Sequence, residues 1–391
     1  MQTFEDLIFD SNLDFFEPIL VGVSFGPDSM ALLDRLIAIG FKKVFVAHIH
    51  HGLREASDEE ENRLRLFCHE NNIPLYVHHL EPLKDYNNLE DRLRNARYTF
   101  FQKIYQSIKA QALFLGHHAN EQVEVGLKRI FEGASLPSLS GMRPKTYLHE
   151  MWVCRPQLYD QKDFLIDYLE KKKIPYAIDP TNFDGPYLRA KMRSKMIPFL
   201  EETFEKKIQG NVLRFMEEMK ELELYLCKKV ENAMKSSISG PYGNFYPKDT
   251  LDPLENFELG FLLTKAGIRL HETRNRIINH LKKNDFGKKV MDQNTLAFIE
   301  KNGLFILKQE LKPNSVFFDQ PKKGWLSFWK GESGYFNPGN KGGWVPISQL
   351  NTTCRKKIFK RYSEQKIPIF LRNFVYVLEH QGKVIYEFLT L

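Results

Sequence analysis

The chain has 391 residues, more than one hydrophobic core normally serves, so we expect two or three domains. Hydrophobic residues make up 42% and charged residues 27%, a balance typical of globular proteins. The acidic N-terminus does not resemble a signal peptide, and no apolar run reaches the roughly 18 residues that a membrane span needs. These features argue against a secreted or membrane protein, and we expect a cytoplasmic one.

Cysteine usage and charge narrow the classes further. Cys68, Cys154, Cys227 and Cys354 lie far apart with no CxxC pair, which disfavours a local zinc or iron–sulfur site and a disulfide scaffold. The net charge of +7 is concentrated at the C-terminal end, where residues 321–391 hold 12 Lys or Arg and 4 Asp or Glu. A localised basic surface favours a polyanion such as RNA, although a merely solvated basic surface has the same composition.

Strands and helices alternate along the first third of the chain. Short apolar runs predict strands at 18–23, 42–51, 74–80 and 112–118, and helical periodicity predicts helices at 30–40, 57–72 and 88–110. This alternation predicts an α/β fold with a parallel sheet covered on both faces. Ligands of such sheets bind at the carboxyl ends of the strands.

The pattern changes after residue 205. One long helix is expected from about 204 to 237, and we predict a mainly helical domain over 206–312. A Gly-, Pro- and aromatic-rich segment follows. A small α+β domain is expected over 321–391, with two strands joined by a turn at Gln381-Gly382.

The hexapeptide SFGPDS at residues 24–29 lies between the first strand and the first helix. Backbone N–H groups, two serine hydroxyls and a helix N-terminus can converge there on a phosphate. A simple strand–helix turn capped by Ser and Asp would have a similar composition. The segment resembles the SGGxDS loop of the ATP-pyrophosphatase (PP-loop) superfamily, with Phe25 where that family has Gly.

Further motifs resemble one group of this superfamily, the tRNA(Ile)-lysidine synthetases. The second signature of the group is matched by HIHHGLR at 48–54. A helix with an N-x-E…R…RY pattern is matched by Asn88, Glu90, Arg94, Arg97 and Tyr98. The segment HHxxDQxE is matched at 116–124, with Glu121 in place of Asp. The segment DPSN…RNxxR is matched, with Ala190 in place of Asn, by Asp179, Asn182, Arg189 and Arg193.

The resemblance implies an adenine nucleotide alpha-hydrolase-like catalytic domain over 1–205, a tRNA-contacting domain over 206–312 and a tRNA-binding domain over 321–391. It implies that ATP activates the wobble cytidine of tRNA(Ile) with a CAU anticodon, and that free L-lysine then displaces AMP. ATP would contact Ser24, Phe25, Gly26, Pro27, Asp28, Ser29 and His48. Mg²⁺ would bind Asp28 and Glu121. Arg94, Arg189 and Arg193 would stabilise developing charge, and Glu124 would hold the lysine ammonium.

Several alternatives remain open. Phe25 could point into the sheet–helix interface, fill the phosphate site or hold a strained positive φ, and we favour the first because the other loop residues are retained. The departures at Phe25, Glu121 and Ala190 would also suit a catalytically weakened tRNA-binding protein, and a sulfur-transferring tRNA enzyme would need paired cysteines. A metal site of His48, His50 and His51 is not expected, because His51 faces the other side of the strand. A homodimer is left open.

Overall fold

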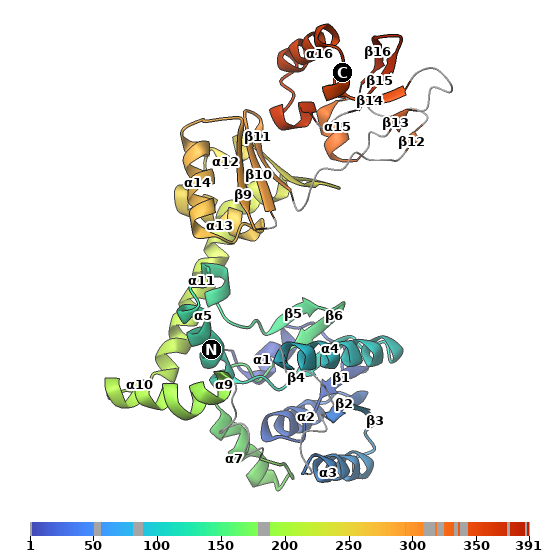
Figure 1. Ribbon diagram of the computed structural model, residues 1–391. Coiled ribbons are helices and arrows are strands. Elements are labelled where there is room, and N and C mark those ends of the chain that lie inside the picture. Colours follow the sequence, from blue (N-terminus) through green and yellow to red (C-terminus); the bar gives the residue numbers. More distant parts are fainter. Residues whose placement is uncertain are drawn as a thin grey trace. The chain divides into compact units, whose positions relative to one another are not determined.

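The computed structural model describes residues 2–50, 56–80, 89–178, 188–293, 295–307, 317–318, 324–331, 335–336, 343–373, 376–387 and 389–390. The chain forms two compact units, Met1–Ala134 with Ser138–Lys220, and Ser135–Pro137 with Glu221–Leu391 (Figure 1). The division falls inside the long helix α11 (Gln209–Lys235), whereas the sequence suggested boundaries near 205 and 321. Among the described helices, none combines the length and apolar composition needed to span a bilayer.

The first unit is built on a six-stranded sheet in the order β3-β2-β1-β4-β6-β5. Its strands are β1 (Ile19–Gly22), β2 (Val44–His50), β3 (Leu75–His79), β4 (Ala112–Leu115), β5 (Lys145–Leu148) and β6 (Met151–Cys154). All neighbouring pairs are parallel except β5 with β6. The predicted parallel α/β sheet is confirmed, and the hairpin β5–β6 is an addition that the sequence analysis did not include.

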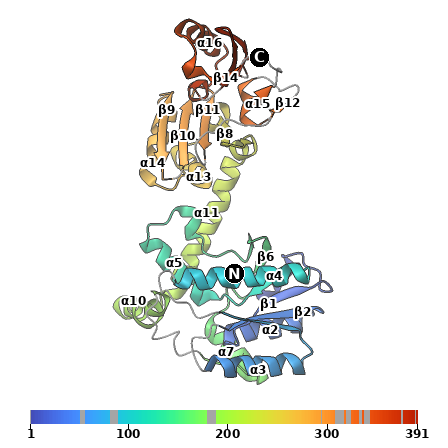
Figure 2. The ribbon, with the colours of Figure 1, turned by 45° about the vertical axis from the view of Figure 1, so that its right-hand side comes forward.

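Helices cover both faces of this sheet because its strands alternate their apolar side chains. Ile19 and Val21 pack on one face with α2, α3 and α7, while Leu20 packs on the other with α4 (Figures 1 and 2). The helices of the unit are α1 (Phe4–Phe9), α2 (Pro27–Ile39), α3 (Ala56–Glu70), α4 (Leu89–Ser107), α5 (Ala119–Phe131), α7 (Lys162–Lys172), α9 (Leu188–Lys191), the π-helical turn η1 (Met192–Met196) and α10 (Ile197–Phe204). The short helix α6 (Leu136–Leu139) follows α5 in the chain.

The strand order reverses between β1 and β4. From β1 the chain passes outward to β2 and β3, then returns to β4 on the other side of β1. The connections after β1 and β4 therefore leave in opposite directions and open a crevice at their carboxyl ends. This is where the sequence analysis placed the candidate loop.

The second unit contains an antiparallel sheet in the order β7-β8-β11-β10-β9. Its strands are β7 (Ile238–Gly240), β8 (Gly243–Pro247), β9 (Lys288–Asp292), β10 (Thr295–Glu300) and β11 (Gly303–Leu307). Helices α12 (Lys248–Leu251), α13 (Asn256–Lys265) and α14 (His271–Lys282) accompany it, and their apolar residues share one core with α11. The segment 206–312 was predicted to be mainly helical; in its described part it combines helices with this sheet.

The other face of the antiparallel sheet shares a core with the C-terminal segment. Phe298 of β10 stacks on Phe370 with ring centroids 4.4 Å apart, and the indole of Trp329 is fully buried beside them. The C-terminal elements are α15 (Trp325–Trp329), α16 (Thr352–Glu364), the 3₁₀ turns η2 (Ile347–Gln349) and η3 (Ile369–Asn373), and strands β12 (Phe317–Phe318), β13 (Tyr335–Phe336), β14 (Gly343–Pro346), β15 (Tyr376–His380) and β16 (Lys383–Tyr386). The predicted final turn is confirmed, since Gln381 and Gly382 have φ of 49° and 77°.

Candidate active site

The loop between β1 and α2 is closed by its own serines. The Ser29 hydroxyl donates to the Gly26 carbonyl at 3.0 Å and accepts from the Ser24 backbone N–H at 3.2 Å. Gly26 is the N-cap of α2 and Pro27 its first residue, which suits Pro because the first N–H of a helix has no intrahelical partner. The first turn of α2 therefore presents free N–H groups and the positive end of the helix dipole to the crevice.

Phe25 has a left-handed backbone with φ of 65°, yet its side chain is fully buried. The ring belongs to the core between the sheet and α2, with the Arg63 guanidinium carbon 5.1 Å from its centroid. Its carbonyl accepts the Ala177 N–H at 2.9 Å. The ring therefore points away from the loop, as favoured from the sequence, and the positive φ considered as a separate outcome is present as well.

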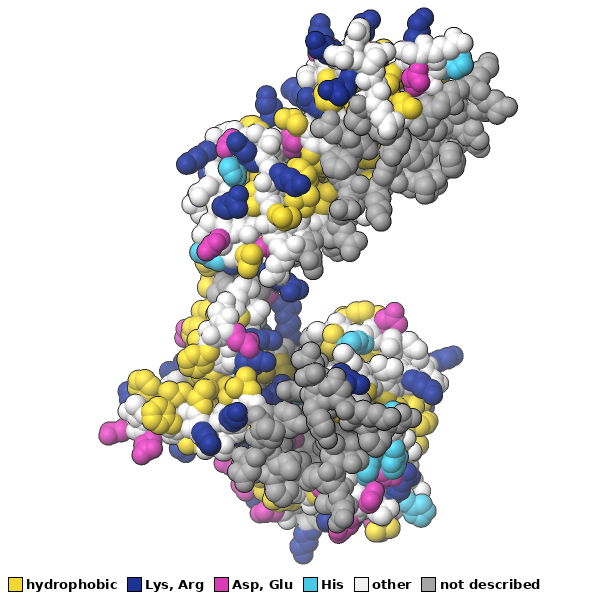
Figure 3. Space-filling model, in the orientation of Figure 1, with side chains coloured by type: hydrophobic (Ala, Val, Ile, Leu, Met, Phe, Trp, Pro, Cys, Tyr) yellow, Lys and Arg dark blue, Asp and Glu magenta, His cyan; other side chains and the backbone are white. Residues whose placement is uncertain are grey.

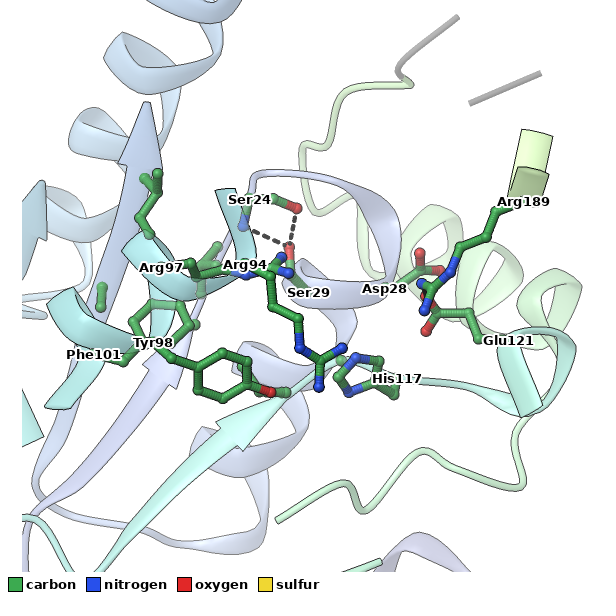
Figure 4. Close-up of a pocket in the computed structure, with 16 residues that line it drawn as sticks. Ser24, Asp28, Ser29, Arg94, Arg97, Tyr98, Phe101, His117, Glu121 and Arg189 are labelled. Atoms are coloured by element: carbon green, nitrogen blue, oxygen red, sulfur yellow. Dashed lines mark hydrogen bonds and ion pairs between the residues drawn. The ribbon is translucent and has the colours of Figure 1, made fainter. Parts of the chain in front are cut away.

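A cavity of about 250 Å³ opens beside this loop at the ends of β1 and β4 (Figure 4). One wall is apolar and includes Tyr98 and Phe101, while Arg94, Arg97 and Arg189 supply positive charge. The complete lining is Gly22, Val23, Ser24, Asp28, Ser29, Ala47, Ile49, Arg94, Arg97, Tyr98, Phe101, Leu115, Gly116, His117, Glu121 and Arg189. A cavity with a partly aromatic apolar wall and clustered cations suits a nucleotide.

Gly116 allows the end of β4 to lie against the start of α2. A Cβ atom at this position would lie 2.9 Å from the Asp28 carbonyl oxygen and 3.2 Å from the Ser29 Cα atom. Because both of those atoms belong to the backbone, a side chain here would displace the loop. The glycine thus brings His117 and Glu121, which follow β4 in the chain, to the same cavity as the loop.

Asp28 carries a carboxylate that is only partly satisfied. Its Oδ2 atom lies 3.6 Å from Nε2 of His118, whereas its Oδ1 atom is buried without a hydrogen-bond partner among the described residues. Its backbone carbonyl is fixed by the Gln157 amide at 2.9 Å. Burial raises the pKa of the Asp28 carboxyl above its ordinary value, and the nearby His118 and Lys162 offset this only in part. A partly buried carboxylate with one unsatisfied oxygen next to a cavity is a ready ligand for a cation.

Glu121 faces Asp28 from the first turn of α5 (Figure 4). Burial acts to raise the pKa of its carboxyl, but His117, His118, Arg189 and Arg193 outweigh that effect and hold the pKa below its ordinary value. Both arginines approach Glu121 Oε1 at 3.9 Å. The two carboxyls of the site are therefore shifted in opposite directions, with Glu121 the more readily ionised.

Glu124 and Arg193 pair with each other rather than line the cavity. The Arg193 guanidinium holds the Glu124 carboxylate through two hydrogen bonds, from Nε to Oε1 and from Nη2 to Oε2, the second at 3.0 Å. Glu124 is almost completely buried, so the ammonium of a free lysine would have to displace Arg193 to reach it. The assignment of Glu124 to the lysine ammonium stays a prediction. In this structure Glu124 positions Arg193, which in turn approaches Glu121.

His117 is the cavity histidine that the sequence analysis left without a role. Burial, with the nearby Arg155, Arg97 and Arg189, lowers its pKa to about 4 against the opposing effect of Glu121. The imidazole is therefore neutral near pH 7 and adds hydrogen-bonding capacity without charge.

The structure brings together six of the predicted residues at the cavity: Ser24, Asp28, Ser29, Arg94, Glu121 and Arg189. His48 is instead buried behind it, where its Nδ1 atom is 2.8 Å from the Val23 carbonyl and supports the loop. Burial lowers the pKa of His48. Residues predicted at 51–54, Asn88, Asp179 and Asn182 lie outside the described residues.

Cavity residues missed as site residues are Arg97, Tyr98, Phe101 and His117. Arg97 and Tyr98 were noticed only as parts of a helix motif. Their spacing in the sequence does indicate a shared helix face. One face of α4 carries, at helical spacing, Arg94, Arg97, Tyr98 and Phe101. That face covers the sheet at the carboxyl end of β1, which only the folded arrangement reveals.

Comparison with known proteins agrees with this arrangement. Residues 4–200 match the family described as PP-loop domain. The tRNA(Ile)-lysidine synthase of Chlamydia caviae is 39% identical over 225 residues, which cover 57% of this chain and 71% of that protein. The tRNA(Ile)-lysidine synthase of Protochlamydia amoebophila is 28% identical over 415 residues, covering 96% of this chain and 89% of that protein. The second similarity extends over nearly the full length of both chains.

The buried ring and left-handed backbone of Phe25 make separable contributions to stability. Phe25→Ala should cost about 3–5 kcal/mol of unfolding free energy, since it leaves a core cavity. Phe25→Gly loses the same ring but relieves the left-handed backbone, so it should be about 1 kcal/mol more stable than Phe25→Ala. Urea unfolding of the three proteins measures both differences. Equal stability of the two variants would contradict a strained backbone at this position.

The raised pKa of Asp28 predicts a stability penalty in the metal-free protein. A carboxyl with a raised folded-state pKa destabilises the fold above that pKa, and the penalty disappears below the unfolded value of 3.8. Asp28→Asn should therefore raise the melting temperature in EDTA at pH 7 by about 1–3 °C. The difference from wild type should shrink as the pH falls towards 4. A variant that melts below wild type at pH 7 would contradict this electrostatic account.

Proposed function

We infer that this chain, which belongs to the tRNA(Ile)-lysidine synthase family of PP-loop proteins, uses ATP to join lysine to the wobble cytidine of a tRNA(Ile) with a CAU anticodon. The observation that carries the proposal is the joint position of a helix N-terminal loop, two carboxyls and three arginines around one cavity. ATP-dependent adenylation needs all three groups, because a nucleotide must be held while negative charge moves to the leaving pyrophosphate. The enzyme is thus a carbon–nitrogen ligase.

The proposed reaction has two steps, adenylation of the base and displacement of AMP by lysine. The O2 atom of the cytidine attacks the α-phosphorus of ATP, the bond to the β-phosphate oxygen breaks, and pyrophosphate leaves. The amine of lysine then attacks C2 of the adenylated base, the C2–O bond breaks, and AMP leaves with the electron pair while the amine loses its proton. The modified base pairs with A instead of G, so the tRNA reads AUA instead of AUG.

The loop residues bind the polyphosphate in this proposal. Ser24, Gly26 and Ser29 offer hydroxyl and backbone N–H groups at the N-terminus of α2, where an anion is favoured. Arg94 and Arg189 line the same cavity and would stabilise the charge that develops on the phosphates. Arg193 does not line the cavity and would act indirectly through Glu121, which it approaches while Glu124 holds it.

Asp28 and Glu121 fit a magnesium ion. Oxygen ligands are what Mg²⁺ prefers, and the buried, unsatisfied Oδ1 atom of Asp28 would gain a partner from it. When bound, the ion would neutralise phosphate charge and polarise the α-phosphate. Its charge would also lower the raised pKa of the Asp28 carboxyl, so the metal-free protein would be the one that carries the electrostatic penalty.

The two alternatives receive less support. A sulfur-transferring enzyme would present cysteine thiols to its substrate, and no cysteine is among the described residues that line the cavity. Burial also raises the pKa of Cys68 and of Cys154 to about 11, which keeps both as unreactive thiols. A weakened enzyme would follow if Phe25 filled the phosphate site, but its ring belongs to the core on the other side of the loop.

Recognition of tRNA is proposed for the C-terminal segment. Helix α16 buries Ile358 and Tyr362 against the core, while Lys356, Lys357 and Lys360 on its other face are exposed. Dark blue basic side chains gather over this part of the molecule in Figure 3. Removing 321–391 would also strip apolar residues from the core shared with the antiparallel sheet, so charge substitution is the cleaner test.

ATP–pyrophosphate exchange tests the proposed chemistry. Labelled pyrophosphate should enter ATP only when a tRNA with a CAU anticodon is present, and a transcript with U at the wobble position should not support exchange. Added lysine should end in the tRNA at one residue per molecule. Asp28→Ala should lower exchange by at least about 100-fold, since it removes a charged group at the reacting centre. Asp163→Ala, at an exposed position of α7, is the matched control.

Exchange that proceeds equally well without tRNA would overturn the proposal that ATP adenylates the cytidine base. Absence of exchange in wild type, with tRNA still bound, would instead favour the catalytically weakened protein.

The basic face of α16 predicts a salt-dependent contact with tRNA. Replacing Lys356, Lys357 and Lys360 by Gln should weaken tRNA binding and lower the slope of log affinity against log salt by about 2, because fewer counterions are released. ATP binding should not change. A matched variant removes three exposed lysines of the first unit, Lys42, Lys43 and Lys171. Equal slopes in the two variants would mean that α16 is only a solvated surface.

A further inference from the structure

Three potential metal ligands converge at one edge of the first unit, away from the nucleotide cavity. His50 ends β2 and His79 ends β3, and the two residues are register partners in neighbouring parallel strands. Their rings stack with centroids 4.6 Å apart. Glu61 reaches the same point from α3. One ligand atom from each of the three residues lies within 4.8 Å of the others.

The contacts within this cluster are short but poorly formed as hydrogen bonds. His79 Nε2 lies 3.0 Å from a carboxylate oxygen of Glu61, and His50 Nε2 lies 3.0 Å from Oδ1 of Asp58. Even so, His50 Nε2 and Glu61 Oε2 are buried and have no partner of hydrogen-bonding geometry in the described part of the chain. A buried polar atom without a partner costs about 1–3 kcal/mol, and two such atoms side by side need a common explanation. A cation between them would provide it.

The surroundings hold the Glu61 carboxylate in place for such an ion. Arg65 donates to Glu61 Oε1 from Nε at 2.8 Å and from Nη2 at 2.7 Å, one turn further along α3. Those bonds occupy Oε1 and leave Oε2 turned towards His79. An outer hydrogen bond that orients a ligating carboxylate is a regular feature of metal sites.

The donor set identifies the class of ion. Two imidazole nitrogens and one carboxylate oxygen form a common zinc set, and tetrahedral ligands about 2.0–2.1 Å from zinc lie roughly 3.3 Å apart, close to the contacts found here. Magnesium and calcium take oxygen ligands and would not use the two histidines. The exposed Asp58 carboxylate contacts His50 but does not belong to the group of converging ligand atoms, so water would supply the fourth ligand.

The geometry points to a zinc site formed by His50, Glu61 and His79, with water completing the coordination. It differs from the three-histidine cluster considered from the sequence, because His48 is turned to the Val23 carbonyl and His51 lies outside the described residues. None of the three protein ligands lines the nucleotide cavity. The ion joins the ends of β2 and β3 to the start of α3, so its role is to stabilise this edge of the sheet.

Metal titration of the full chain tests the site without any activity assay. After treatment with EDTA and its removal, the protein should bind one Zn²⁺ in competition with a chromophoric chelator. Co²⁺ should give the visible absorption of a four-coordinate ion, be displaced by Zn²⁺, and persist in excess Mg²⁺. Zinc should also raise the melting temperature, because it binds only the folded chain.

Two variants assign the ligands. His79→Asn and Glu61→Gln should each weaken zinc binding by at least about 10-fold and abolish the zinc-dependent rise in melting temperature. His79 is exposed, so its replacement leaves the fold intact even if loss of the buried Glu61 does not. His69→Asn, an exposed histidine of α3, is the matched control and should bind zinc as wild type does. A wild-type protein that binds no zinc, or a His79→Asn variant that binds it equally well, overturns the proposal.

Discussion

The left-handed backbone at Phe25 is the constraint on which the site depends. A φ of 65° turns the chain sharply out of β1, so that the ring enters the core while the next residues begin α2. Glycine usually holds such a turn because a Cβ atom makes it costly. Here the buried ring and the hydrogen bond from Ala177 offset that cost. The same turn leaves Ser24, Asp28 and Ser29 lining the cavity beside the N-terminus of α2.

The electrostatics of the cavity follow from how tightly the loop and β4 approach each other. Because Gly116 has no side chain, Asp28 and the first turn of α5 share one small space. Burial then raises the pKa of Asp28, while surrounding cations keep the pKa of Glu121 low despite its burial. The result is a pair of unlike carboxyls with an arginine network behind them. Of the two carboxyls, Asp28 is the one whose ionised form is disfavoured by burial, and a bound cation would relieve that penalty.

Much of the first unit could be predicted from the sequence because its signals are local. Apolar runs marked β1 to β4, and the phosphate loop was placed by residues 24–29. The hairpin β5–β6 was not predicted, because its turn is formed by His149 and Glu150 instead of the usual Asn-Gly. Both residues have positive φ. In the antiparallel sheet of the second unit, only β8 and β11 pair across a long stretch of chain, with helices α12 to α14 and strands β9 and β10 between them. Periodicity within one segment cannot report such pairing.

Site residues with a local sequence signal could likewise be predicted, whereas roles that depend on packing could not. Ser24, Asp28, Ser29 and Glu121 could be assigned from local motifs, and each lines the cavity. The contacts of Glu124 could not be predicted from local motifs. Its burial and its pairing with Arg193 arise only when α5 and the π-helical turn η1 pack together. Both residues were candidates for contact with substrate. Their pairing leaves Glu124 to orient Arg193.

A phenylalanine in the phosphate loop leaves the nucleotide site usable, because its ring is buried in the core. Calorimetric titration of wild-type protein with a non-hydrolysable ATP analogue and Mg²⁺ tests it most directly. We expect saturable binding of one nucleotide per chain, and an affinity that changes by less than about 5-fold, or 1 kcal/mol, in Phe25→Gly. A wild-type protein that binds no nucleotide, beside a Phe25→Gly variant that does, would contradict it.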